Sequence, residues 1–176
     1  MNILYEHDWR IDPLYAVIVG IDAGLQTISK RIGGGDGFDE QSALEYAEPL
    51  LGLGFVAAQA YALGTWTDLN RIRASRNKPK IEDKMVCYRC DPIKLGGKAS
   101  RIEAINAVAN YFKHHDEWDA TWPTNKTTKT LRDIGITEAT EFPCIKATEL
   151  FCKSWEFVVI QAVVKEWREH VLKNLA

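Results

Sequence analysis

The sequence predicts an all-α fold: one domain formed by a bundle of about four to six helices. Apolar residues recur at spacings of three and four through most of the chain, whereas the alternation typical of strands is nearly absent. The 176 residues are 46% hydrophobic and 26% charged, an ordinary composition for a single domain with a buried core. The chain contains no internal repeat and no low-complexity tail.

Two long helices are expected in the first half. Asp12-Pro13 has the form of an N-cap followed by proline at the first helical position, and the apolar spacing then continues from Leu14 until three glycines begin at Gly33. A second helix should run from about Glu40 to Leu63, kinked or divided at Pro49, with a short continuation toward Arg76. No charged residue occurs between Leu50 and Leu63, so that half should be buried on nearly all sides.

A basic segment at about 71–100 follows and is expected to be irregular, with a small two-strand ribbon left open. Ten Lys/Arg and three Asp/Glu lie from Arg71 to Arg101, a net +7, so the remainder carries −9 of the total of −2. Such asymmetry suggests an anionic partner, although the arm can also be a solvated loop that pairs with the acidic remainder. The candidate nucleic-acid-binding residues are Arg71, Arg73, Arg76, Lys78, Lys80, Arg89 and Arg101.

The central stretch from Arg101 to Trp122 carries the candidate chemistry. Ser100 and Glu103 have the spacing of a capping box that starts a helix at about Arg101. One side of this helix is apolar (Ile102, Ile105, Val108, Ala109, Phe112), and the other carries Glu103, Asn106, Asn110, His114 and Glu117, with Lys113 at its edge. Any surface helix shows this division. An imidazole, an ammonium and an amide four residues or fewer apart also suit phosphodiester chemistry.

Asn110-Tyr111-Phe112-Lys113-His114 reads as N-x-x-K-H and resembles a motif of HEPN-superfamily proteins. These are small helical domains, many of them metal-independent ribonucleases of prokaryotic toxin and defence systems. The family pattern has an arginine directly before the asparagine, where this sequence has Ala109. The resemblance implies His114 as acid/base, Asn110 and Lys113 as phosphate-positioning residues, and an active groove between the two subunits of a homodimer.

The last third should contain a short helix from Lys126 to Ile134 and a long helix from about Pro143 to Asn174. The inner side of the long helix is expected to carry Phe151, Trp155, Val158, Val159, Ala162, Val163 and Trp167. Arg168-Glu169-His170 reads as a cationic helix end favoured by the helix dipole.

Metals, cofactors and membranes are not expected. Cys87-x-x-Cys90 has zinc-knuckle spacing, but Cys144 and Cys152 form no second pair, so free thiols are predicted. The N-terminus lacks a secretory pattern and no run of 18 apolar residues occurs, so a cytoplasmic protein is expected.

Three functions remain open at this stage. The first is a HEPN-like RNA-binding protein or ribonuclease, a homodimer with RNA as its ligand and an antitoxin or other protein as its partner. The second is a non-catalytic helical interaction or regulatory module, which Ala109 favours. The third is a protein that binds a nucleotide or small molecule.

Overall fold

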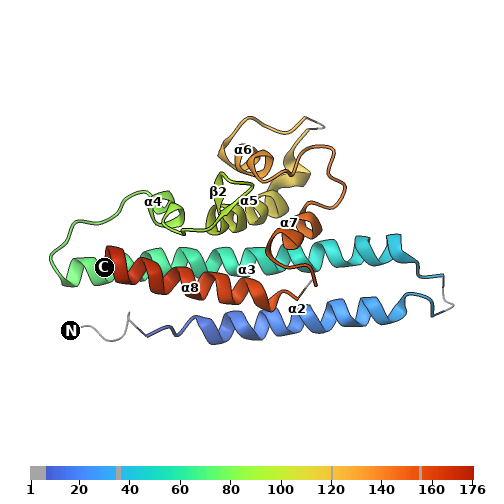
Figure 1. Ribbon diagram of the computed structural model, residues 1–176, viewed down its shortest axis with the longest axis horizontal. Coiled ribbons are helices and arrows are strands. Elements are labelled where there is room, and N and C mark those ends of the chain that lie inside the picture. The colour runs from blue at the N-terminus through green and yellow to red at the C-terminus, as the bar shows by residue number, and fades with distance from the viewer. Residues whose placement is uncertain (1–6, 35–36, 120, 155) are drawn as a thin grey trace.

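The computed structural model describes residues 7–34, 37–119, 121–154 and 156–176. Within them it contains seven α-helices, a short 3-10 helix and a two-stranded ribbon, which confirms the all-α fold class. The elements, labelled as in Figure 1, are α2 (Ile11–Arg31), α3 (Glu40–Ser75), α4 (Lys84–Arg89), β1 (Lys94–Leu95), β2 (Ala99–Ser100), α5 (Arg101–His114), η1 (His115–Glu117), α6 (Lys126–Asp133), α7 (Pro143–Phe151) and α8 (Val158–Leu175).

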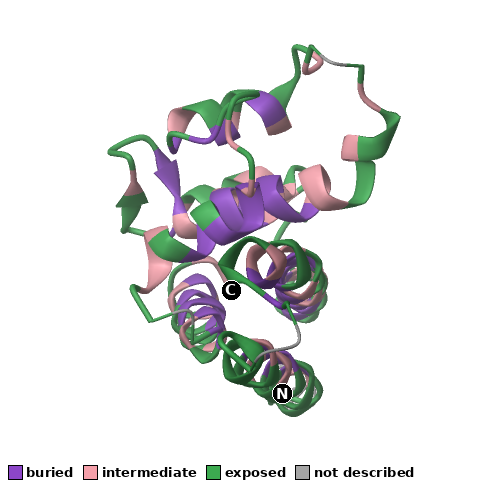
Figure 2. Cartoon of the chain, turned by 90° about the vertical axis from the view of Figure 1, so that its right-hand side faces the viewer, coloured by how far each residue is buried: buried purple, intermediate pink, exposed green. Residues whose placement is uncertain are grey.

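Helix α3 is the central helix of the fold. Figure 1 shows α2 and α8 running along one side of it, while α4, the ribbon, α5, α6 and α7 gather on the other. Helix α3 packs most extensively against α5 and α2, and then against α7 and α8. Figure 2 shows the buried residues concentrated where these elements meet. Fully buried large side chains there include Leu51, Phe55, Ile102, Ile105 and Trp167.

Helix α2 begins two residues earlier than the sequence suggests. Arg10, not Asp12, is its N-cap, and Gly33 follows its end with a φ of +78°, a left-handed conformation that glycine adopts without strain. Only Leu14, Ile18, Ile21 and Leu25 of this helix are buried. By length and composition alone α2 is apolar enough to cross a membrane, and 22% of its most apolar window is buried.

Helix α3 runs unbroken through Pro49, so the predicted division at this proline is wrong. Packing against five other helices stabilises α3 although the proline removes one backbone hydrogen bond. Its glycines allow close contact: a Cβ at Gly52 would overlap the ring of Phe112, and one at Gly54 would overlap the ring of Phe157.

The basic segment is more ordered than predicted. Residues 71–75 complete α3, Asp83 caps α4 by accepting a hydrogen bond from the Met85 N–H at 2.9 Å, and an antiparallel ribbon pairs Lys94 with Ser100 and Leu95 with Ala99. Gly96 and Gly97 form its turn with φ of +57° and +74°. The ribbon that the sequence left open is therefore present.

The predicted long helix from Pro143 to Asn174 is wrong, because residues 152–157 separate α7 from α8. Neither helix has a local side-chain cap, and each is capped by a carboxylate from a distant helix. Glu48 of α3 accepts hydrogen bonds from the Cys144 and Ile145 N–H groups at 2.8 and 2.9 Å. Asp22 of α2 accepts from the Phe157 and Val158 N–H groups at 2.7 and 3.3 Å. The predicted inward position of Trp155 lies outside the described residues.

A buried ionic cluster joins α2, α3 and α8. Asp68 is fully buried and accepts a hydrogen bond from Arg10, while Arg168, 3% exposed, lies 3.5 Å from the same carboxylate. Tyr61 donates its hydroxyl proton to Asp8, and Arg168 lies 3.6 Å from that carboxylate. Arg168 is therefore a core residue, and its reading as an exposed helix-end cation is wrong.

Candidate functional site

Two of the three motif side chains meet on one residue of α3. Helix α5 begins with the predicted capping box, in which Ser100 and Glu103 exchange hydrogen bonds. One turn before its end, the half-buried Asn110 accepts a hydrogen bond from the Gln59 amide at 2.8 Å, and Lys113 donates to the Gln59 carbonyl at 2.8 Å. Gln59 also donates to the Asn106 side chain at 3.0 Å. The polar stripe of α5 is thus the rim of the α3–α5 contact.

His114 turns to a different partner. Its Nδ1 lies 3.1 Å from a carboxylate oxygen of Glu117, and both side chains are largely exposed. Ala109, at the position where the family motif has arginine, is fully buried. The structure therefore brings Asn110 and Lys113 together, while His114 forms a separate imidazole–carboxylate pair at the end of the helix.

The predicted nucleic-acid-binding cations divide into several groups. Arg71 faces Asp68 at 3.7 Å, and Lys80 faces Glu82 at 3.4 Å. Arg73 and Lys78 donate to the backbone carbonyls of Leu175 and Ala176. Arg76 lies directly beyond the last turn of α3, where its N–H continues the helical hydrogen bonding.

Arg101 is the most enclosed of these predicted cations. Its guanidinium binds the fully buried Asp91 at 2.9 Å and Glu166 at 3.2 Å. The hydrogen bond that Arg101 donates to Asp91 raises the pKa of Arg101 above its ordinary value, although burial opposes the shift. Arg101 therefore fixes the start of α5 against Asp91 and α8.

Arg89 belongs to a basic groove of about 750 Å³ between α4, the ribbon and α6. Four lysines share the groove with it: Lys94, Lys98, Lys126 and Lys129. Its two carboxylates are those of Glu103, 2.9 Å from Arg89, and Asp133, 2.8 Å from Lys129 and 3.6 Å from Lys98. Five cations against two anions leave the groove with a net positive charge.

The shape of the groove depends on glycine and on the end of α6. Gly96 lies so close to the Asp133 carbonyl that a Cβ would approach it to 2.5 Å, which holds the ribbon turn against α6. Lys94 donates to the Arg89 and Asp91 carbonyls at 3.1 Å each and so closes the end of α4. The neighbouring lysines hold the pKa of Asp133 below its ordinary value, through the hydrogen bond from Lys129 first.

Part of the sequence signal for this groove lay outside the basic segment. Lys126 and Lys129 are three residues apart and share a face of a short helix, a spacing that places two cations side by side. Nothing in the local sequence indicates that this face lies beside the ribbon. Lys94 and Lys98 contributed to the segment charge, but no pattern distinguished them from the other cations.

Two further lysines, Lys84 of α4 and Lys113 of α5, add positive charge outside the groove. Burial lowers the pKa of Lys113, and the charge of Lys84 lowers it further. Arg89 and Lys84 stand at opposite ends of α4, about 7.5 Å apart along its axis at 1.5 Å per residue. A bound anion near either end would relieve the repulsion between neighbouring ammonium groups.

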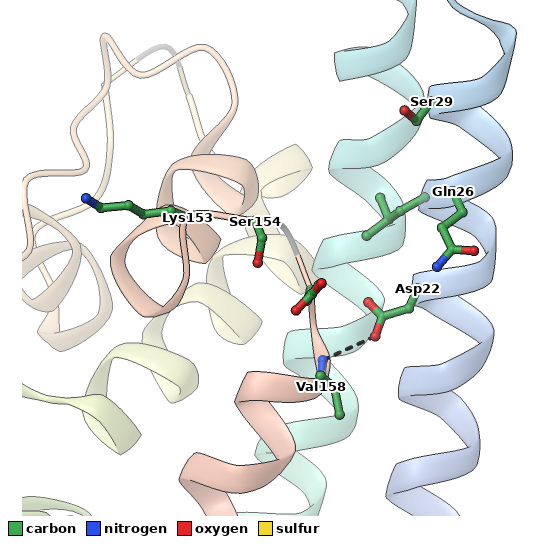
Figure 3. A pocket seen from close by; sticks show the side chains of 8 residues that line it. Asp22, Gln26, Ser29, Lys153, Ser154 and Val158 are labelled. Carbon is green, nitrogen blue, oxygen red and sulfur yellow. Dashed lines mark hydrogen bonds between the residues drawn. The ribbon is translucent and has the colours of Figure 1, made fainter.

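Other cavities are less charged. Figure 3 shows a cavity between α2 and the α7–α8 connection, with a volume of about 640 Å³, where Asp22 points to the start of α8 and Lys153, Ser154 and Gln26 also line the wall.

Cys87 and Cys144 are buried thiols, and burial raises the pKa of Cys87 to about 11. Across residues 7–34, 37–119, 121–154 and 156–176, no three His, Cys, Asp or Glu side chains come together as metal ligands would.

The chain matches no protein-family model, no curated protein and no solved structure.

Proposed function

We propose that the protein is a non-catalytic RNA-binding module that holds the phosphate backbone in the groove between α4, the ribbon and α6. The observation that carries the proposal is the gathering of five Lys and Arg side chains around one concave surface with two carboxylates. Phosphate contacts from such side chains supply most of the affinity of sequence-independent nucleic-acid binding.

Three of the five groove cations are exposed to a ligand. The side chains of Arg89, Lys98 and Lys129 are 58%, 67% and 77% exposed. Ion pairs this exposed contribute only about 0–1 kcal/mol, so a phosphate can replace the carboxylate partners at little cost. Lys84 at the start of α4 and Lys113 near the end of α5 do not line the groove, and we expect them to meet the next phosphates of a strand that follows α5.

The test is fluorescence anisotropy of a labelled single-stranded RNA with the purified full-length protein at several salt concentrations. Four neutralised phosphates predict a slope of about −3 for log K against log salt, since each contributes about −0.7 on single strands. The double variant Lys98→Glu/Lys129→Glu should weaken binding at least tenfold and flatten the slope.

The matched control is Lys165→Glu/Lys173→Glu, which makes the same charge change on exposed positions of α8. It should retain most of the affinity. Equal losses in the two double variants would mean that overall charge, and not the groove, attracts RNA. Displacement of the RNA by a mononucleotide at equal phosphate concentration would favour the nucleotide-binding alternative.

A metal-independent ribonuclease is the second candidate, and the His114–Glu117 pair is the observation that favours it. A carboxylate beside an imidazole orients the ring and supports proton transfer near neutral pH. Eleven residues separate Glu103 in the groove from His114, about 16 Å along α5. Cleavage of RNA in the presence of a chelator, lost in His114→Ala, would establish this activity. Intact RNA with wild type and variant would exclude it.

A further inference from the structure

The outer face of α2 and α3 is apolar, and no element formed by the described residues covers it. It is formed by Trp9, Pro13 and Val17 on one side and by Leu53, Ala57 and Ala60 on the other. Five of these six residues border a groove of about 290 Å³, which Leu53 extends by one turn of α3. Trp9, Val17 and Leu53 are 51%, 46% and 54% exposed. The core helices of a monomer usually turn such side chains inward.

Charged groups are excluded from this face. Helix α3 carries no charged residue from Pro49 to Thr67, and Asp22 alone is charged between Pro13 and Ser29 of α2. Asp22 faces the start of α8 instead. Arg10 borders the groove, but its guanidinium binds Asp68 and stacks 4.0 Å from the Trp9 ring. No charge therefore has to be desolvated when the face is covered.

We propose that this face is covered by a second copy of the chain, in a twofold contact that packs α2 and α3 against the same pair. A half-exposed Trp, Leu or Val leaves on the order of 70–120 Å² of apolar surface, and with the small residues between them the face amounts to roughly 500 Å² per copy. Two copies together bury about 1,000 Å², the area that a specific interface should reach.

The shape of the face fits its own copy. The small side chains of Ala57 and Ala60 leave a shallow depression, and the larger side chains of Val17 and Leu53 lie at its edges. In a twofold contact, Val17 and Leu53 of each copy can therefore pack into the depression of the other copy. A bilayer surface is less well matched, because peripheral helices usually carry Lys and Arg beside their apolar face and this face has none that is free of a partner. The contact uses a different side of α3 from the one that carries Gln59, and so leaves α5 and the basic groove uncovered.

The experiment is sedimentation velocity of the full chain over a range of concentrations. The expected species has twice the 19.9 kDa chain mass. Val17→Lys would place a charge in the contact and should raise the dissociation constant on the order of 100-fold. Val86→Lys is the matched control, since Val86 is 47% exposed on α4, and it should leave the dimer intact.

A second variant, Ala60→Arg, changes the same contact and provides the test if Val17→Lys does not fold. Circular dichroism confirms that each variant is folded before sedimentation is interpreted. A wild-type protein that is monomeric at all concentrations would overturn the proposal, as would equal dissociation of the Val17 and Val86 variants. A monomer that floats with phosphatidylcholine vesicles would also overturn it and would assign the face to a membrane.

Discussion

The carboxylate of Asp22 should be a large single contribution to the stability of α8. This helix has Phe157 at its N-cap, which offers no side-chain acceptor, and two of its first N–H groups donate to Asp22 instead. Loss of a cap costs about 0.5–2 kcal/mol, and loss of a negative charge at a helix N-terminus costs about 0.3–1 kcal/mol more. Asp22→Ala should therefore lower the free energy of unfolding by roughly 1.5–2.5 kcal/mol.

The assay is urea unfolding followed by helical circular dichroism, with both the midpoint and the slope fitted. Asp22→Asn keeps an oxygen acceptor without the charge and should lose less than half as much. Gln26→Ala, one turn further along α2 and exposed in the same cavity, is the control and should change stability by about 0.5 kcal/mol or less. If Asp22→Ala costs no more than Gln26→Ala, the capping argument is refuted.

Three further variants or conditions test the buried polar groups. Arg168→Met leaves the buried Asp68 with less compensation and should cost about 2–4 kcal/mol in urea unfolding, whereas a further Asp68→Leu change should recover part of that loss. Tyr88→Phe should raise stability by about 1 kcal/mol, since its buried hydroxyl has no hydrogen-bond partner among the described residues, and an unchanged or lower midpoint would contradict this. Burial raises the pKa of Tyr61 and raises that of Tyr111 to about 12, so the folded state holds protons that the unfolded chain releases from about pH 10. Stability should therefore fall as pH rises above 10, and urea midpoints at pH 9 and 11 should differ in that direction.

Periodicity was sufficient to predict the fold class and most helix positions, because each helix buries one stripe of its own residues. The division between α7 and α8 was not predictable in this way. The apolar spacing continues through the connection, and the caps that start both helices come from Glu48 and Asp22, which are about 95 and 135 residues distant. Arg168 was misread for the same reason, since its partner Asp68 lies 100 residues away.

For the candidate site, the spacing on α5 indicated that Asn110, Lys113 and His114 share one side, but only Asn110 and Lys113 meet, while His114 pairs with Glu117. It could not indicate that Gln59 of α3 occupies the space between them. The basic groove could be predicted only in part. The charge excess led to Arg89 but did not distinguish Lys94 and Lys98, while Lys126 and Lys129 join them through the close approach of α6 to the ribbon turn at Gly96, which no local pattern encodes.

The length of α3 has a consequence for how the protein unfolds. Its 36 residues extend about 54 Å, and every other long helix rests on some part of it. Amide protons of its buried middle residues Leu51, Phe55, Ala58 and Ala62 should be the slowest to exchange with deuterium, at a rate close to that of global unfolding. The chain therefore cannot be divided into two fragments that each retain native structure.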